Sequence, residues 1–361
     1  MSKIFSSIFL QPPTFLEMPY VGLEISDSAV RFVEFVDKAG VLTLGHFATV
    51  PLTEGIVSDG EIKEEKKLAS ILTELKKKYS LEFVKVSLPE NKSYLFKMQL
   101  PGQLSKPAEI RQAIEFRLEE NIPIQTKDAI FDFEIIDTSP DGTIQNISVS
   151  ASPAQLVENY TRCLTSAGLT PISFEVESKS VARAVVAKND ARPYIVLNIK
   201  DKTTTISIVE RGQVEFSSSA NIGGSFVDET IRREKKVSLE EAQKIKELYM
   251  YKDTKDSLEV FASLLNFIGA IKDETDRFYS YWFNRRPKNN QVDIEKILLC
   301  GRNSMISGFE RYLYLAMNKD TDPADVWINA FSTEEYLPPI NFVDSLDYAV
   351  AIGLALPVIQ K

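Results

Sequence analysis

Residues 20–28 read YVGLEISDS, and residues 194–202, far along the chain, read YIVLNIKDK. Each stretch is an apolar strand that ends in a polar turn, and each turn leads into a second run of β-branched and aromatic residues, at 30–36 or at 203–209. A turn glycine and a third strand follow in both places. Two copies of one three-strand unit predict a duplicated α/β chain whose two lobes face each other across a cleft.

The bulk composition limits the class of protein. With 361 residues, 44% hydrophobic and 26% charged, the chain is long enough for two globular lobes. A net charge of −9 argues against nucleic acid as a partner, because neutralising phosphates needs a positive surface. Cys163 and Cys300 are the only cysteines, so a reducing cytoplasm is expected. Residues 3–10 form a short apolar arm that is too short to span a bilayer, and a weak membrane contact is the alternative for it.

The order of predicted elements divides the chain into two lobes with an insertion. The first lobe is expected over 1–187 and the second over 188–361, with a compact α+β subdomain inserted into the first at about 83–175. A helix opened by Ser105 and Pro107 crosses this insertion, with Ile110 and Ile114 at helical spacing. Small insertions of this kind carry partner contacts.

Several chemistries are absent from the sequence. His46 is the only histidine, which leaves no histidine cluster for zinc. A Ser-His-Asp site would have to use His46, which lies in a predicted strand where a structural role is expected. No glycine-rich phosphate loop of the GxxxxGK[ST] or GxGxxG type occurs. No catalytic residue and no metal site are therefore predicted.

What remains is a set of turns that could hold a nucleotide between the lobes. Such a site needs tight turns whose backbone N–H groups meet phosphate oxygens, with carboxylates nearby for hydrated magnesium. The turns after Ile25 and Ile199 occupy equivalent places in the two copies. Gly223 and Gly224 directly precede a helix, and Gly301 follows a predicted strand. In this order, and together with the repeat, these weak signals become specific.

Helices are also expected in the second lobe. The first covers 225–233 and the next covers 238–251. Ser238 is the expected N-cap of the latter, with Glu241 three residues on, which is the spacing of a capping box.

From residue 21 to residue 356 the chain resembles the PilM family, and through it FtsA and the actin-like ATPases. The resemblance implies an actin-like ATPase fold, that is, a duplicated ribonuclease H-like fold of two lobes with an inserted SHS2-like subdomain. The segments that carry it are the first phosphate motif at 20–25 and 28–31, the insertion at 108–123 and 132–134, the adenosine segment at 221–226 and 242–246, and the closing helix at 348–356.

Through this resemblance, a nucleotide site is implied with ATP and magnesium as the cofactor, and whether it is used stays open. The implied nucleotide-binding residues are Glu24, Ser28, Asn198, Gly223, Gly224, Gln243, Lys246 and Gly301.

Departures from the family pattern gather in this site. Glu24 and Asn198 stand where the two motifs have Asp, and Lys200 stands where Gly is usual. Gln243 replaces the Glu expected at ribose, and Asp27 places a carboxylate toward phosphate. The run 300–303 replaces glycines, so side chains intrude there. We therefore expect weakened or lost ATP binding and no hydrolysis.

The leading functional hypothesis is a structural adaptor of type IV pilus assembly, at the cytoplasmic inner face of the cell membrane. The resemblance implies that it binds the N-terminal cytoplasmic tail of a bitopic, PilN-like membrane protein and contacts other inner-membrane pilus components, so that its own membrane contact is indirect. Ile110, Ile114 and Arg117 of the insertion helix are the expected partner-binding residues.

Two other classes remain open. A sugar-kinase-like phosphotransferase needs a magnesium carboxylate pair, against which Asn198 argues. An ATP-binding, FtsA-like division or filament-forming protein carries a C-terminal amphipathic membrane helix, for which the closing residues 356–361 are too short.

Overall fold

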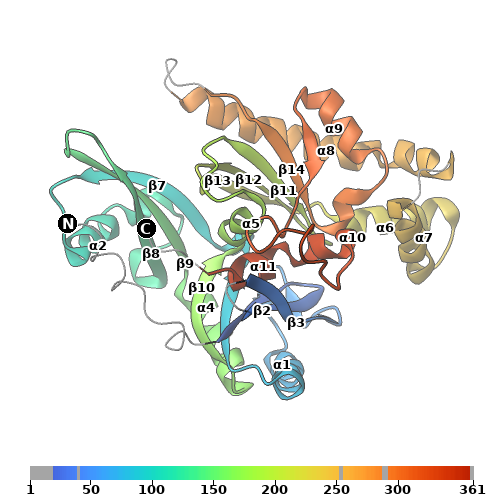
Figure 1. Cartoon of the computed structure of the whole chain (residues 1–361), viewed down its shortest axis with the longest axis horizontal. Coiled ribbons are helices and arrows are strands. Elements are labelled where there is room, and N and C mark those ends of the chain that lie inside the picture. Colours follow the sequence, from blue (N-terminus) through green and yellow to red (C-terminus); the bar gives the residue numbers. More distant parts are fainter. Residues whose placement is uncertain (1–18, 39–40, 252–254, 287–291, 358–361) are drawn as a thin grey trace.

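The computed structural model describes residues 19–38, 41–251, 255–286 and 292–357 (Figure 1). The N-terminal arm at 3–10 lies outside them. Among the described residues, no helix combines the length and the apolar character that crossing a membrane requires.

The first repeat builds a five-stranded mixed sheet in the order β10-β6-β1-β2-β3. β1 pairs antiparallel with β2 and parallel with β6, and β2 continues into β3 as a meander. The continuous apolar run of β1 is typical of a central strand covered on both faces. The bounds are β1 (Tyr20–Ile25), β2 (Ala29–Lys38), β3 (Val41–Pro51), β6 (Phe83–Leu88) and β10 (Thr170–Val176), with a small ribbon of β4 (Val57–Ser58) and β5 (Glu61–Ile62) beside it.

The second repeat builds a matching sheet in the order β13-β12-β11-β14-β15. β11 pairs antiparallel with β12 and parallel with β14. Each sheet therefore consists of a three-strand meander followed by two parallel strands, which confirms the duplication inferred from the sequence. The bounds are β11 (Tyr194–Ile199), β12 (Thr204–Glu210), β13 (Gln213–Ala220), β14 (Lys296–Cys300) and β15 (Thr321–Pro323).

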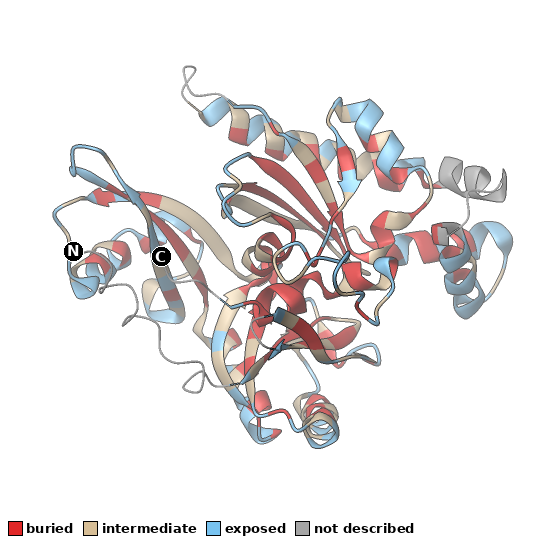
Figure 2. Cartoon of the chain, in the orientation of Figure 1, coloured by how far each residue is buried: buried red, intermediate tan, exposed pale blue. Residues whose placement is uncertain are grey.

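Two helices lie between the sheets and join them. α5 (Glu177–Val185) and α11 (Ala349–Ala355) contribute to one hydrophobic core that also contains Val33 of the first sheet and Val196 of the second. Glycines allow the close approach: a Cβ on Gly353 would lie 1.8 Å from the Ser180 carbonyl oxygen of α5, and one on Gly22 would lie 2.1 Å from the Ala351 carbonyl oxygen. Figure 2 shows the resulting continuous buried region in the middle of the molecule.

The remaining helices cover the outer faces of the sheets. α1 and α4 complete the core of the first lobe, whereas α6, α7, α8 and α9 complete that of the second. The bounds of the helices and 3-10 turns outside the insertion are α1 (Glu65–Tyr79), η2 (Glu90–Lys92), α4 (Ala154–Ser166), α6 (Gly224–Lys235), α7 (Leu239–Tyr251), α8 (Lys255–Arg285), η5 (Arg302–Met305), α9 (Phe309–Met317), α10 (Phe342–Ser345) and η6 (Leu346–Tyr348).

The insertion forms a separate three-stranded antiparallel sheet, β7-β9-β8, beside the two lobes (Figure 1). It has its own hydrophobic core, to which Ile147 and Leu118 contribute. Its elements are β7 (Tyr94–Pro101), α2 (Pro107–Glu115), α3 (Leu118–Asn121), η3 (Thr126–Asp128), β8 (Ala129–Thr138) and β9 (Ile144–Pro153).

This arrangement differs from the insertion expected at about 83–175. β6 and β10, the strands that begin and end that range, both pair within the first-lobe sheet, and Tyr160 of α4 lies in the first-lobe core. An apolar run on its own does not reveal which sheet a strand joins. We propose residues 94–153 as the bounds of the inserted subdomain.

Candidate functional site

The polar turns of the two repeats meet in the cleft between the sheets. Glu24, Ser28 and Asn198 line one small cavity together with Lys200. Ser28 and Lys200 also line a second, neighbouring cavity, which extends toward Glu90. The structure thus brings together the two strand ends that the sequence repeat made equivalent.

Lys200, directly after β11, reaches from the second lobe toward the first. Its ammonium lies 2.7 Å from both carboxylate oxygens of Glu177, the first residue of α5. It also lies 3.6 Å from Oε1 of Glu24 at the end of β1. The Glu24 and Glu177 side chains are 1% and 4% exposed and that of Lys200 is 19% exposed. We call these three residues the Lys200 cluster.

Burial and mutual attraction compete in the Lys200 cluster. Burial raises the pKa of Glu24 and of Glu177, although the Lys200 charge opposes the rise for both. Burial by itself would lower the pKa of Lys200, but the charges of Glu177 and Glu24 outweigh it and the lysine pKa is raised. The ammonium is therefore charged at neutral pH and supplies positive charge to both buried carboxylates, while the Arg31 guanidinium lies 3.7 Å from Glu24 as a second cation.

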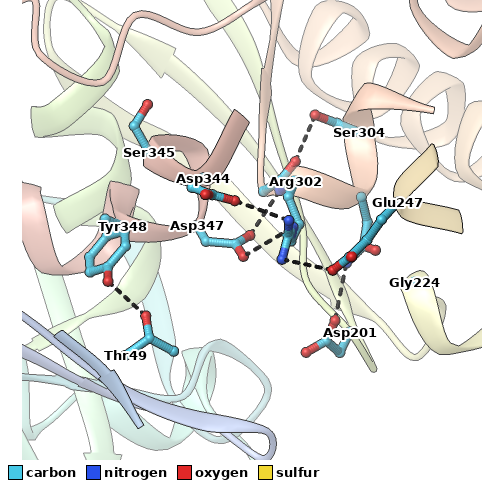
Figure 3. Close-up of polar contacts among 12 residues, drawn as sticks. Thr49, Asp201, Gly224, Glu247, Arg302, Ser304, Asp344, Ser345, Asp347 and Tyr348 are labelled. Atoms are coloured by element: carbon cyan, nitrogen blue, oxygen red, sulfur yellow. Dashed lines mark hydrogen bonds and ion pairs between the residues drawn. The ribbon is translucent and has the colours of Figure 1, made fainter. Parts of the chain in front are cut away.

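A second ion cluster lies beside the first, around Asp347 of η6 (Figure 3). The Asp347 carboxylate is 3.6 Å from the Arg31 guanidinium of β2 and accepts a hydrogen bond of 2.8 Å from the backbone N–H of Arg302. The Arg302 side chain also donates to Asp344 at 3.0 Å and lies 3.7 Å from Glu247 of α7. Burial raises the pKa of Asp347, and Arg31 opposes this rise.

The glycines expected at the nucleotide are in close contact with other parts of the protein. A Cβ on Gly223 would lie 2.6 Å from the Asp201 carbonyl oxygen, and one on Gly224 would lie 2.1 Å from the Asn303 side chain. Gly301 has a positive φ of 76°, and a Cβ there would meet the Ile199 carbonyl oxygen at 2.2 Å. These glycines serve the approach of one protein segment to another.

The two residues expected on the adenosine side of the nucleotide, Gln243 and Lys246, lie in different environments. Lys246 is buried and donates to Asp228 at 2.8 Å. Gln243, on the same helix, is exposed and lines neither cavity.

Asp27 does not face the cleft as a free carboxylate. It accepts hydrogen bonds from the backbone N–H groups of Asp59 and Gly60, at 2.8 and 2.9 Å. It therefore holds the β4–β5 turn against the first motif.

In this conformation the cleft residues do not fit a magnesium nucleotide. The cavity lined by Glu24 and Asn198 has a volume of about 10 Å³, which is room for about one water molecule. The neighbouring cavity has about 40 Å³. The Lys200 ammonium is paired with the carboxylates to which magnesium would be drawn, and the Asn303 side chain lies against Gly224 where a nucleotide would approach the backbone.

The expected partner-binding residues divide between core and surface. Ile110 and Ile114 are 1% and 0% exposed and lie in the core of the insertion, so in this structure they support helix α2 and do not face a partner. Arg117 is exposed and donates to the Gln99 carbonyl oxygen. Its neighbour Phe116, at the break between α2 and α3, is 84% exposed.

Comparison with known proteins identifies the family. The family model described as type IV pilus assembly protein PilM matches residues 22–358. This chain belongs to the PilM family. A solved structure described as a PilM–PilN type IV pilus biogenesis complex is similar to this PilM-family chain with a TM-score of 0.76 and 21% identity, over 94% of this chain and 98% of that chain.

Two further solved structures are similar to this PilM-family chain. The ethanolamine utilization protein EutJ from Carboxydothermus hydrogenoformans has a TM-score of 0.55 and 16% identity, over 96% of this chain and 90% of that chain. MreB5 of Spiroplasma citri bound to AMPPNP has a TM-score of 0.55 and 15% identity, over 95% of each chain. The actin-like ATPase fold expected from the sequence is confirmed.

Sequence reasoning missed four residues of the cleft: Arg31, Glu90, Glu177 and Asp347. Arg31 lies within the first motif, at a position where the family pattern has a lysine. This match could have identified Arg31 as a cleft residue from the sequence. Glu90, Glu177 and Asp347 come from three segments far apart in the chain, and no local pattern marks them.

Proposed function

We propose that this PilM-family protein is a cytoplasmic structural adaptor at the inner face of the cell membrane. It binds the N-terminal cytoplasmic tail of a PilN-like, single-pass membrane protein, and through it the other inner-membrane components of the pilus machine. The family assignment supports this proposal, and so does the similarity to the structure described as a PilM–PilN complex.

The observation that carries the proposal is an exposed aromatic side chain on the insertion. Phe116 is 84% exposed at the α2–α3 break, although the neighbouring apolar residues Ile114 and Leu118 are fully buried. A large aromatic group that is held by a folded helix and not covered is a suitable anchor for an extended peptide. Arg117 beside it adds a cationic donor for the peptide backbone or for an acidic residue.

A calorimetric titration with the synthetic tail of the PilN-like protein from the same organism tests this role. Phe116→Ser is expected to weaken binding about tenfold or more, as truncation of an anchor does, while the melting temperature stays unchanged because the side chain is exposed. Leu337→Ser is the matched control, because Leu337 is also 84% exposed but lies outside the insertion. Equal affinity of the Phe116 variant and the wild type would contradict the proposed anchor.

The second part of the proposal is that the nucleotide site is degenerate and that binding of the tail does not require ATP. The Lys200 cluster and the small cavity at Glu24 and Asn198 support it. The other candidate function is an ATP-binding, FtsA-like division or filament-forming protein. Of this, the similarity to MreB5 bound to AMPPNP supports only the nucleotide binding.

Titration with magnesium and ATP separates the two functions. The wild type is expected to give no measurable heat of binding and no turnover. The double change Asn198→Asp with Lys200→Gly is expected to gain magnesium-dependent binding, because it removes the ammonium from Glu24 and Glu177 and adds the carboxylate that the motif has elsewhere in the family. Tight binding by the wild type would contradict a degenerate site.

A further inference from the structure

The Lys200 cluster connects segments from both lobes. Lys200 directly follows β11 of the second sheet, Glu24 lies in β1 of the first sheet, and Glu177 opens the interlobe helix α5. No other cation lies within ion-pair distance of Glu177 among the described residues. The Lys200 ammonium therefore bridges two lobes and the helix between them through a single charged atom.

Further polar contacts cross the cleft at the same level. The Glu90 carboxylate accepts one hydrogen bond from the Ser217 hydroxyl of β13 in the second lobe, and one of 2.9 Å from the backbone N–H of Ser178 in α5. Lys97 of the insertion forms an ion pair with Glu215, also in β13. The first-lobe side of the cleft thus holds the second lobe at several points, and the side chains of the Lys200 cluster are more buried than those of the Lys97–Glu215 pair.

In a nucleotide-binding relative of this fold, closure of the cleft is a consequence of a ligand that contacts both lobes. Here the space where that ligand would bind contains a lysine that belongs to the protein. Without Lys200, Glu24 would keep only the Arg31 guanidinium at 3.7 Å, and Glu177 would be buried with no cation within ion-pair distance among the described residues. The two carboxylates would then repel each other and Glu177 would bear the full desolvation cost, so the ammonium is needed to bring β1, α5 and β11 together.

We propose that Lys200 is a built-in clamp, an internal cation that holds the two lobes closed without a bound nucleotide. This inference rests on the proposed loss of nucleotide binding and assigns the residue that replaces the ligand. The protein is then a permanently closed scaffold, and the surfaces that it offers to partners do not vary with the supply of ATP.

Hydrogen exchange measured by mass spectrometry, without any partner, tests the clamp. In Lys200→Met, exchange at 20–25, 177–185 and 194–199 is expected to become about tenfold faster or more. Local opening of the wild type must break the Lys200 ion pairs, and the variant has none to break, so its opening costs less free energy. Lys202→Met is the matched control: Lys202 also forms an ion pair across the cleft, 3.4 Å from Glu54, but both side chains are exposed and the pair is expected to contribute little. The control variant should exchange like the wild type.

Further variants keep the test decisive if Lys200→Met folds poorly. The double variant Lys200→Met with Glu177→Gln removes one of the stranded carboxylates, and it should fold and still exchange fast in the same segments. Lys200→Arg keeps the charge and should exchange like the wild type. Exchange as slow as in the wild type, in Lys200→Met or in the double variant, would overturn the clamp. A failure of both variants to fold while Lys200→Arg folds would also overturn it, because the cation would then be required for folding of the whole protein and not only for closure of the lobes.

A parallel sample of the wild type with magnesium and ATP separates this proposal from the preceding one. Unchanged exchange is expected. Added protection in the cleft segments would overturn the proposed loss of nucleotide binding, and the clamp with it. If the lysine variants exchange like the wild type and ATP has no effect on the wild type, the clamp is wrong, but the degenerate nucleotide site and the adaptor function are not contradicted.

Discussion

Buried carboxylates in the cleft are compensated in different ways. Glu24 and Glu177 share the Lys200 ammonium, whereas Asp347 lies near Arg31. Glu90 is 7% exposed and, among the described residues, has hydrogen bonds from Ser217 and Ser178 but no ion pair within 4.0 Å. Burial raises its pKa above the ordinary value of 4.5, and the two hydrogen bonds only reduce the rise.

This gives Glu90 a defined influence on stability. A carboxyl with a raised native pKa favours the folded state when it is protonated, so its contribution is present below about pH 4.5 and is lost as the pH rises through the native pKa. Glu90→Gln imitates the protonated acid, because its amide can donate to the Ser217 hydroxyl and its oxygen can accept from Ser178. The variant is expected to gain free energy of unfolding relative to the wild type as the pH rises from about 4.5 to 8.

Urea titrations at a series of pH values measure this difference, in which the other titrating groups cancel. Glu229→Gln is the control with the opposite sign: the hydrogen bond from Arg232 lowers the pKa of Glu229, so that carboxylate stabilises above its ordinary pKa and loses its effect as the pH falls. If the difference in free energy of unfolding between Glu90→Gln and the wild type shrinks with rising pH, the burial argument is contradicted.

At the scale of elements, local chemistry decides where helices begin and how closely they approach. The capping box expected at Ser238 and Glu241 is confirmed: the Ser238 hydroxyl accepts from the Glu241 N–H at 3.2 Å, and the Glu241 carboxylate accepts from the Ser238 N–H at 2.9 Å. The single insertion helix expected from Ser105 onward is instead broken into α2 and α3 at Phe116 and Arg117.

The contact between α5 and α11 depends on one glycine. Gly353→Ala would place a Cβ 1.8 Å from the Ser180 carbonyl oxygen. The Cβ is fixed by its bond to the backbone of α11 and the oxygen belongs to the backbone of α5, so neither atom can move aside cheaply. We expect a loss of about 1–3 kcal/mol in the free energy of unfolding, the usual cost of overpacking. Gly269→Ala in α8 is the matched control, because among the described residues nothing beyond the adjoining helix backbone lies within 4 Å of the added Cβ and alanine favours a helix by up to about 1 kcal/mol.

Chemical denaturation of the two alanine variants checks this difference. Equal stability of Gly353→Ala and the wild type would show that α11 can shift on α5 without cost. A destabilised Gly269→Ala would point to a contact of α8 that the structure does not contain.

At the scale of the whole molecule, the two lobes share a core. α11 comes from the end of the chain but packs on β1 at its beginning, through Gly22, and on α5 through Gly353. Either half of the chain, 1–187 or 188–361, is therefore missing part of the core that it needs, and the division into two lobes describes duplication and not independent folding.

This shared core predicts cooperative unfolding. Differential scanning calorimetry of the intact chain is expected to give one transition for the two lobes, with equal calorimetric and van't Hoff enthalpies, and the fragment 1–187 is expected not to fold because it lacks α11. The exposed insertion, which has a core of its own, is the one part that could melt separately. Two transitions of similar enthalpy, or a folded 1–187 fragment, would contradict the shared core.

The sequence by itself determined the duplication, the three consecutive strands that open each copy and the family, because these depend on local patterns: apolar runs, polar turns and motif spacing. It also identified Glu24, Asn198 and Lys200 as the unusual residues of the cleft. Only the tertiary structure decided that Lys200 joins Glu24 to Glu177, that Asp347 lies beside Arg31 and Arg302, and that Ile110 and Ile114 face inward. These contacts link segments tens to hundreds of residues apart, and their geometry arises from how sheets and helices pack, which no local pattern encodes.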